Sequence, residues 1–377
     1  MKTFIVGLLV FSFFFSVGIV LARHKPLWTD ELYGQQFTIQ GKSWSNIFFA
    51  QHGEINLFPA SRALQKGFLQ LIHWQLPFVW DGDTWFVAHP QAQLILRVLP
   101  DILMSLAMTA IVLFFGVRAG FVGGVVAALI CLSMPMVWLY WVEARFYPLW
   151  FMLTVFQSLL FLDIISKKET HPPVIPLAFV HAGLCLTAPL GLVQTIICLG
   201  LLWCAGIRRG KFHMMAGAVP LFLGAYYFYA QGQMKMFVAV SWQDLFFYNF
   251  PLEGLILLGM YVIVLFLSRQ EESLQKCFLF GRIFLPFCLA FMAIALVGVF
   301  FAVCKSSIPH IVPVVPRHFI FLTPVAIIMM AAVFSDFWLA SAKCVWWRSV
   351  ILIIFLTGLL SQLLSVYVIV NKLGVYF

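Results

Sequence analysis

Long apolar runs alternate with shorter polar loops along almost the whole chain. Eleven runs have, or come close to, the length of about 20 residues that an α-helix needs to cross the hydrocarbon core of a bilayer. They lie at residues 4–22, 98–116, 120–140, 148–165, 174–189, 191–206, 214–230, 251–268, 283–303, 319–335 and 349–370. The pattern predicts an all-α fold, a polytopic transmembrane bundle of about eleven helices.

One loop, at about residues 23–97, is much longer than the others. It is too polar to cross a membrane, but residues 43–49 and 58–69 form amphipathic stretches that contain Trp, Phe and basic side chains. Such stretches are typical of helices that lie in the plane of the membrane interface. No change of composition marks a soluble domain, so we expect residues 1–377 to form a single membrane domain.

The composition supports this class. Hydrophobic residues make up 63% of the chain and charged residues only 10%, with a mean hydropathy of +1.00. Soluble domains are typically about 25% charged. The net charge of +9 would suggest nucleic acid in a soluble chain, but here the cations lie in short loops. We therefore expect membrane lipids around the protein and no nucleic-acid partner.

The cations divide unevenly between alternate loops. One side has twelve, namely Lys2, Arg118, Lys167, Lys168, Arg208, Arg209, Lys211, Arg269, Lys276, Arg282, Lys343 and Arg348. The short loops and tail of the other side have five, namely Arg145, Lys235, Lys305, Arg317 and Lys372. The positive-inside rule then predicts a cytoplasmic amino terminus, an external carboxyl terminus and an external first loop.

An acidic pair, Asp30-Glu31, follows the first apolar run by a few residues in a chain with only 14 carboxylates. The pair is either a solvated helix end balanced by Arg23 and Lys25, or part of a polar reaction centre at the membrane surface. In the second case one carboxylate acts as a general base. Only one of two adjacent carboxylates can point at a given site, so the other would orient a ligand, a metal or a neighbouring cation. The order alone does not distinguish them.

Arginines on the same predicted side are candidate anion ligands. Arg145 lies in a tight loop between the third and fourth predicted helices, and Arg97 and Arg317 lie at the outer entries of the second and tenth. A single arginine at such a place is often a snorkelling anchor. Three on the side of an acidic pair favour an anionic substrate, because a guanidinium can make two charge-assisted hydrogen bonds to a phosphate.

The loop of Arg145 contains two further polar candidates, Glu143 and Tyr147. They are four residues apart and would share a face if helical structure continued through the loop. Pro148 fits the first turn of the following helix.

A third polar cluster, His52, Glu54 and Asn56, lies in the long first loop. Together with His310 or His318 it would in principle bind a divalent metal, but the spacing matches no strong metal signature. We expect no cofactor and no metal, with a divalent cation as the alternative.

Taken in order, these residues resemble motifs of the GT-C class of membrane glycosyltransferases. The branch most similar contains protein O-mannosyltransferases, aminoarabinose transferases and bacterial RgtA/B/C/D-like enzymes. The resemblance lies in the segments Trp28-Thr29-Asp30-Glu31-Leu32-Tyr33, Glu54-Ile55-Asn56-Leu57-Phe58, Leu96-Arg97-Val98-Leu99-Pro100, Glu143-Ala144-Arg145-Phe146-Tyr147 and Pro316-Arg317-His318-Phe319. All five lie on one predicted face. The second segment departs from the family, which often has His-Pro-Pro-Leu-Tyr there.

The resemblance implies inverting transfer of a sugar from a polyprenyl-phosphate donor to a lipid, glycan or protein acceptor, on the external (periplasmic) side of the bacterial inner membrane. It assigns Asp30 as the general base and Glu31 as a supporting carboxylate. It assigns the donor phosphate to Arg97, Arg145 and Arg317. The residues expected to position the substrates are His52, Glu54, Asn56, Glu143, Tyr147 and His318.

Two other classes of protein remain as alternatives. A transporter or flippase of a lipid-linked glycan would use the same cations to bind phosphate. It should show ionisable residues near the bilayer midplane or paired broken helices, whereas the predicted spans contain few charges, with Asp101 and Asp163 near span ends. A non-catalytic assembly protein would not require acidic residues and arginines gathered on one face.

Overall fold

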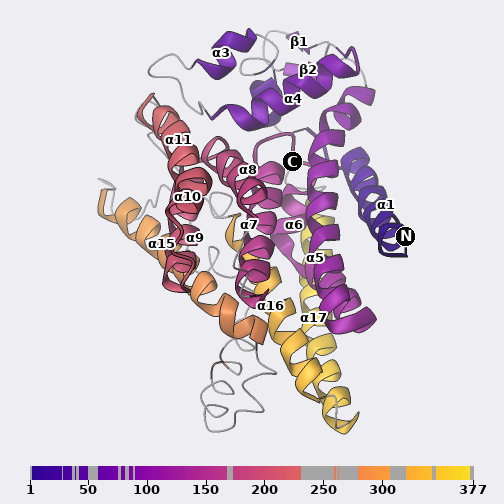
Figure 1. The fold of residues 1–377 in the computed structure, drawn as a ribbon. Helices are drawn as coiled ribbons and strands as arrows, with labels where there is room; N and C mark the ends of the chain where they lie inside the picture. Colours follow the sequence, from indigo (N-terminus) through magenta and orange to yellow (C-terminus); the bar gives the residue numbers. More distant parts are fainter. Residues whose placement is uncertain are drawn as a thin grey trace.

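The computed structural model describes most of the chain, and its described part is mainly α-helical (Figure 1). The described residues are 2–27, 29–35, 39, 42–49, 58–74, 78–80, 85–87, 90–167, 173–230, 259, 262, 279–305, 320–341 and 345–373. Described helices overlap ten of the eleven predicted apolar runs. The remaining run, 251–268, lies outside the described residues except at positions 259 and 262.

The first loop forms a layer at one end of the helical bundle (Figure 1). After α1 (Lys2–His24) come the short helices α2 (Thr29–Tyr33) and α3 (Trp44–Phe48), and then α4 (Pro59–Leu71). The strands β1 (Phe78–Trp80) and β2 (Trp85–Val87) pair antiparallel. The helices α3 and α4 coincide with the two predicted amphipathic stretches, and the hairpin is an addition to the all-α expectation.

The packing of α4 explains why this helix lies on the bundle. Its Arg62 and Gln65 are buried, and Gln65 Nε2 donates to the carbonyl of Leu96 over 2.9 Å. Its Leu64 and Leu71 are exposed. Two polar side chains of α4 thus point into the protein together with Leu69, and some of its apolar side chains point out, which suits a helix in contact with a membrane interface.

The second and third predicted spans are joined in α5 (Pro90–Ser133), which contains a break at Gly120, where φ is 74°. A Cβ on Gly124 would lie 3.3 Å from the Cα of Gly116. Eight residues along one straight helix are about 12 Å apart, so the chain turns back on itself at Gly120. The break coincides with the boundary predicted between 98–116 and 120–140.

The third predicted span ends earlier than expected, at Ser133. A separate short helix, α6 (Pro135–Tyr140), follows it. Met134 is extended (φ −86°, ψ 117°), as expected for a residue before proline, because the proline ring disfavours helical geometry there. This interruption places the segment after α6 beside the end of α1.

The remaining described elements complete the bundle. They are α7 (Tyr147–Lys167), α8 (Val174–Cys185), α9 (Pro189–Cys204), α10 (Gly210–His213), a π-helical turn (Met214–Ala218), α11 (Val219–Ala230), α15 (Leu279–Lys305), α16 (Leu322–Ala340) and α17 (Val345–Leu373). All residues of α16 from Leu322 to Asp336 are buried. It packs on α5, α7 and α15 and is the centre of the described core.

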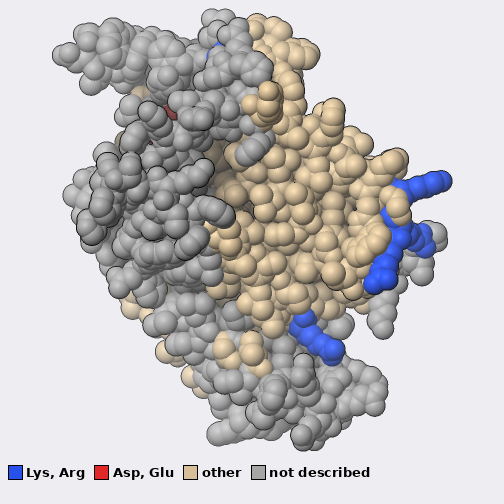
Figure 2. All heavy atoms as spheres, turned by 90° about the vertical axis from the view of Figure 1, so that its left-hand side faces the viewer, with Lys and Arg blue, Asp and Glu red and all other residues tan. Residues whose placement is uncertain are grey.

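The protein is a membrane protein by the length and apolar character of its helices. Four described helices are long and apolar enough to cross a bilayer, at Thr3–His24, Gln91–Ser133, Tyr147–Lys167 and Leu322–Ala340. Large apolar side chains such as Phe121, Phe179 and Phe222 are exposed. Figure 2 shows a broad area of described residues without a charged side chain, bordered by Lys and Arg. Such a surface suits lipid rather than water.

Candidate active site

Three segments far apart in sequence meet at the end of the bundle that bears the α3–α4 layer. They are α2 with Asp30 and Glu31, the start of α5 with Arg97, and residues 141–146 between α6 and α7, here called the 141–146 loop. Side-chain bonds join all three segments. The sequence therefore predicted correctly that Asp30, Arg97 and Arg145 lie at the same end of the bundle.

Glu31 and Arg97 form a fully buried ion pair, with both side chains 0% exposed. Arg97 Nη2 donates to Glu31 Oε2 over 2.7 Å, and Nε donates to Oε1 over 3.2 Å. The same guanidinium donates to the carbonyl of Pro26 over 2.7 Å and to that of Lys25. Arg97 thus ties the chain leaving α1 to α5, and in this arrangement it has no exposed surface for an anion.

Glu31 also holds the backbone of the 141–146 loop. Its Oε1 accepts a hydrogen bond from the amide of Ala144 over 2.7 Å, and Gln35 Nε2 donates to the carbonyl of Ala144 over 3.4 Å. The first loop therefore binds both peptide groups of the residue that precedes Arg145. Of the two adjacent acids, Glu31 is the one that orients a cation and a loop.

Asp30 is the exposed member of the acidic pair. Its side chain is 46% exposed, and its Oδ2 accepts from Arg145 Nη1 over 2.8 Å, with Arg145 16% exposed. The guanidinium also lies 5.3 Å from the ring centre of Tyr147. Burial lowers the pKa of Arg145, but the neighbouring Tyr147, Glu143 and Asp30 outweigh it and raise the pKa above its usual value. Arg145 is therefore a permanent cation at the accessible edge of the cluster.

Lys25 is a member of the cluster that the sequence suggested only as a charge balancing the acidic pair. Its side chain is buried, and Nζ donates to the carbonyl of Leu139 over 2.5 Å. Burial lowers its pKa, while the charges of Glu143 and Glu31 act in the opposite direction. Its position directly after the first span could have identified Lys25 as a cluster residue, because a lysine side chain there can reach the end of the bundle.

Glu143 and Tyr147 are both buried, but the helix that would have placed them on one face does not continue through the loop. Helix α6 ends at Tyr140, residues 141–146 form turns and bends, and α7 begins at Tyr147. The condition for a shared face is therefore not met, and the backbone of the loop bonds to α2 instead. Pro148 lies in the first turn of α7, as predicted.

Several predicted site residues lie outside the described part of the chain. They are His52, Glu54, Asn56, His310, Arg317 and His318. Among the residues that the structure describes, no group of three or more His, Cys, Asp or Glu side chains could hold a metal ion. The metal alternative, which relies on His52 and Glu54, remains a hypothesis.

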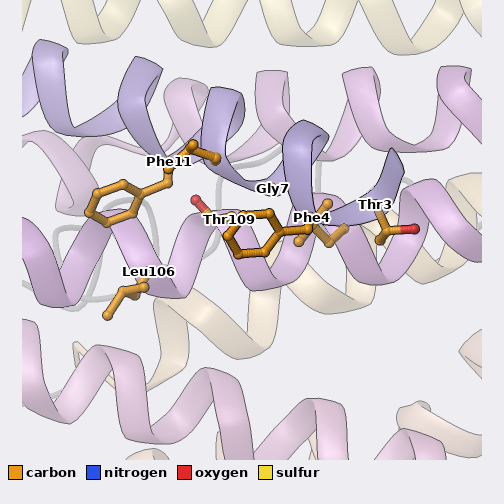
Figure 3. Close-up of a pocket in the computed structure, with 8 residues that line it drawn as sticks. Thr3, Phe4, Gly7, Phe11, Leu106 and Thr109 are labelled. Carbon is orange, nitrogen blue, oxygen red and sulfur yellow. The ribbon is translucent and has the colours of Figure 1, made fainter. Parts of the chain in front are cut away.

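A separate apolar groove of about 460 Å³ lies between α1 and α5. Figure 3 shows Phe4 and Phe11 from α1 beside Leu106 and Thr109 from α5. These α5 residues follow Arg97 by nine and twelve positions, or about 14 to 18 Å along a helix. The groove is therefore farther along the bundle than the cluster, and its lining has too few polar groups to bind a sugar.

The cluster offers an exposed carboxylate beside a partly exposed guanidinium, both supported by a buried ion pair. Such a set can take a proton from a hydroxyl or an amine and bind an anion next to it. A comparison with protein-family models and with curated protein sequences found no match.

Proposed function

We propose that this protein is a membrane glycosyltransferase of the GT-C type, which transfers a sugar from a polyprenyl-phosphate donor to an acceptor outside the cytoplasm. The proposal includes about eleven spans, a cytoplasmic amino terminus and an external cluster around Asp30. It is supported by the resemblance of the five sequence segments and by the charge asymmetry between alternate loops. The donor sugar and the acceptor are not specified by these features.

The observation that carries the proposal is the Asp30–Arg145 pair at the exposed edge of an otherwise buried polar cluster. Burying charged side chains is costly even when they are paired, so a buried ion pair next to an accessible acid and cation is a candidate functional site. Of the two adjacent acids, Glu31 is fully buried and Asp30 is 46% exposed. Asp30 is therefore accessible to a substrate, and its position is fixed by the buried Glu31 next to it.

In the proposed reaction the acceptor oxygen or nitrogen forms a bond to the anomeric carbon, and the bond from that carbon to the phosphate oxygen breaks. Polyprenyl phosphate leaves with the electron pair, and the acceptor proton passes to Asp30. The donor already carries a good leaving group, so the enzyme mainly orients the acceptor and stabilises the growing charge on phosphate. A single displacement inverts the anomeric centre.

The two described arginines have different roles in this proposal. Arg145 binds the donor phosphate, because it is partly exposed and adjacent to the base. When phosphate engages the guanidinium, Asp30 is released to accept a proton. Arg97 is a positioning residue, because protein groups occupy its guanidinium. Arg317 remains a proposed second phosphate ligand.

The test uses cells that lack this protein, complemented with the parent, Asp30→Asn or Asp163→Asn. Asp163 is a matched control because it is also a paired carboxylate, bonded to Arg118 and Lys167 in a different part of the bundle. Mass spectrometry should show a lipid-linked sugar that accumulates without the protein and is consumed with the parent and the control. Asp30→Asn should lower turnover by roughly two to four orders of magnitude at equal protein level. Turnover within threefold of the parent would exclude Asp30 as the base.

A flippase of lipid-linked glycans is the alternative function. Two carboxylates, Asp101 and Asp336, are buried within helices, but both lie near the ends of predicted spans and not at the midplane that a transporter would use. Each accepts hydrogen bonds from the protein, Asp101 from Trp141 and Asp336 from the amide of Gly281, which favours structural roles for both. Purified protein in detergent separates the functions, because a transferase still consumes its donor there and a flippase has no bilayer to act across.

A further inference from the structure

Asp101 is a buried carboxylate that the proposed chemistry does not use. It lies on α5 one helical turn after Arg97, and its side chain is 0% exposed. Its Oδ1 accepts from Trp141 Nε1 over 2.9 Å and from Ser105 Oγ over 3.2 Å. Its Oδ2 has no hydrogen-bond partner among the described residues. A buried carboxylate with one unsatisfied oxygen is costly, so its presence calls for a reason.

The surroundings of Asp101 leave no space for another side chain. A Cβ on Gly18 of α1 would lie 1.8 Å from Asp101 Oδ1, so α1 can approach α5 here only because residue 18 is glycine. Helix α1 therefore packs directly against the carboxyl, whose Oδ1 accepts from Trp141.

Trp141 is the first residue of the 141–146 loop, and it is fully buried. Its indole packs against Phe14 of α1 and Trp138 of α6, with ring centres 6.0 and 5.6 Å away. The hydrogen bond to Asp101 fixes the indole within this aromatic group. The loop is thus attached at its start to α5 through Asp101 and in its middle to α2 through Glu31.

We propose that Asp101 is a positioning residue which, through Trp141, fixes the 141–146 loop and thereby holds Arg145 against Asp30. The effect of Asp101 on catalysis rests on the proposed function. The position of the loop does not, and it can be measured without turnover. Arg97 and Asp101 lie one turn apart on the same face of α5. Arg97 then attaches α2 to this face, and Asp101 attaches the 141–146 loop to it.

The experiment compares Asp101→Ala, Asp101→Asn, Trp141→Phe and the double variant Asp101→Ala/Trp141→Phe. The amide of Asp101→Asn keeps an oxygen acceptor for the indole, and the original Oδ2 makes no bond that it would lose. Trp141→Phe removes the N–H donor and keeps an aromatic ring. Ser105→Ala is the matched control, since it removes the other donor to Oδ1 without touching the loop.

Hydrogen exchange of residues 141–146 in the full-length protein is the first readout. Exchange should rise about tenfold in Asp101→Ala and in Trp141→Phe, the scale expected for loss of one buried hydrogen bond. It should stay at the parent level in Asp101→Asn and Ser105→Ala. The double variant should exchange no faster than either single variant, because both remove the same bond.

Donor turnover is the second readout. Asp101→Ala and Trp141→Phe should each lower kcat about tenfold, and Asp101→Asn should retain the parent kcat. Unchanged exchange in Trp141→Phe, or a loss in Asp101→Asn as large as in Asp101→Ala, would overturn the positioning role. If the parent itself transfers no sugar, the proposed function fails and the exchange measurements alone decide the role of Asp101.

Discussion

Replacing Arg97 tests whether this arginine stabilises the protein or binds the substrate. Arg97→Ala leaves the Glu31 carboxylate buried without its arginine partner, while the hydrogen bond from the amide of Ala144 stays. Removing one partner of a buried ion pair typically costs about 3–5 kcal/mol, because the other charge stays desolvated and uncompensated. The variant also loses the bonds to the carbonyls of Pro26 and Lys25. We therefore expect a large loss of stability.

The loss of stability is measured by thermal unfolding in detergent, with size-exclusion chromatography as the readout of the folded protein. A cost of this size corresponds to a fall in melting temperature on the order of 10 °C, extrapolated from about 2–4 °C per kcal/mol for domains of 150–250 residues. Arg145→Ala is the matched comparison, because its ion pair is partly exposed and should be worth about 1 kcal/mol or less. It should melt within about 4 °C of the parent and yet show lower donor turnover.

A second variant tests whether Arg97→Ala is destabilising because of the unpaired charge or because of the cavity that it leaves. Arg97→Met combined with Glu31→Leu removes both charges, and apolar replacement of a buried pair is often nearly neutral for stability. The double variant should therefore melt well above Arg97→Ala, although it loses the acceptor for the amide of Ala144. If Arg97→Ala melts within about 2 °C of the parent, the buried pair does not hold the end of the bundle together and our reasoning is wrong.

Three further predictions concern the site and its surroundings. Arg145→Lys and Arg145→Ala should each raise the inhibition constant of polyprenyl phosphate against donor turnover by roughly 10- to 100-fold, since lysine lacks the planar fork; an unchanged constant argues against phosphate binding there. Single cysteines beside Asp30 and Arg145 should react with an impermeant maleimide in intact cells, and one beside Arg118 only after permeabilisation; the reverse pattern would invert the proposed topology. Asp336→Ala should lower the melting temperature, since the amides of Phe280 and Gly281 lose their acceptor, but should leave the inhibition constant unchanged.

The sequence by itself determined the class of the protein and the end of the bundle at which the site residues meet. Apolar runs of bilayer length predict helices because every backbone polar group must be satisfied within a membrane-spanning segment. Alternation of the loops then places Asp30, Arg97 and Arg145 on one side, without knowledge of how the helices pack. The turn at Gly120 and the start of α7 next to Pro148 also follow from local backbone preferences.

Only the tertiary structure decided which charges are buried. Asp30 and Glu31 are neighbours in sequence, yet Glu31 pairs with Arg97 at a separation of 66 residues and Asp30 with Arg145 at 115. The cost of burying a charge depends on the partners that the fold brings to it, and a local pattern does not contain them. For the same reason the contact of Asp101 with Trp141, which requires the glycine at position 18 of another helix, was not predictable from α5 alone.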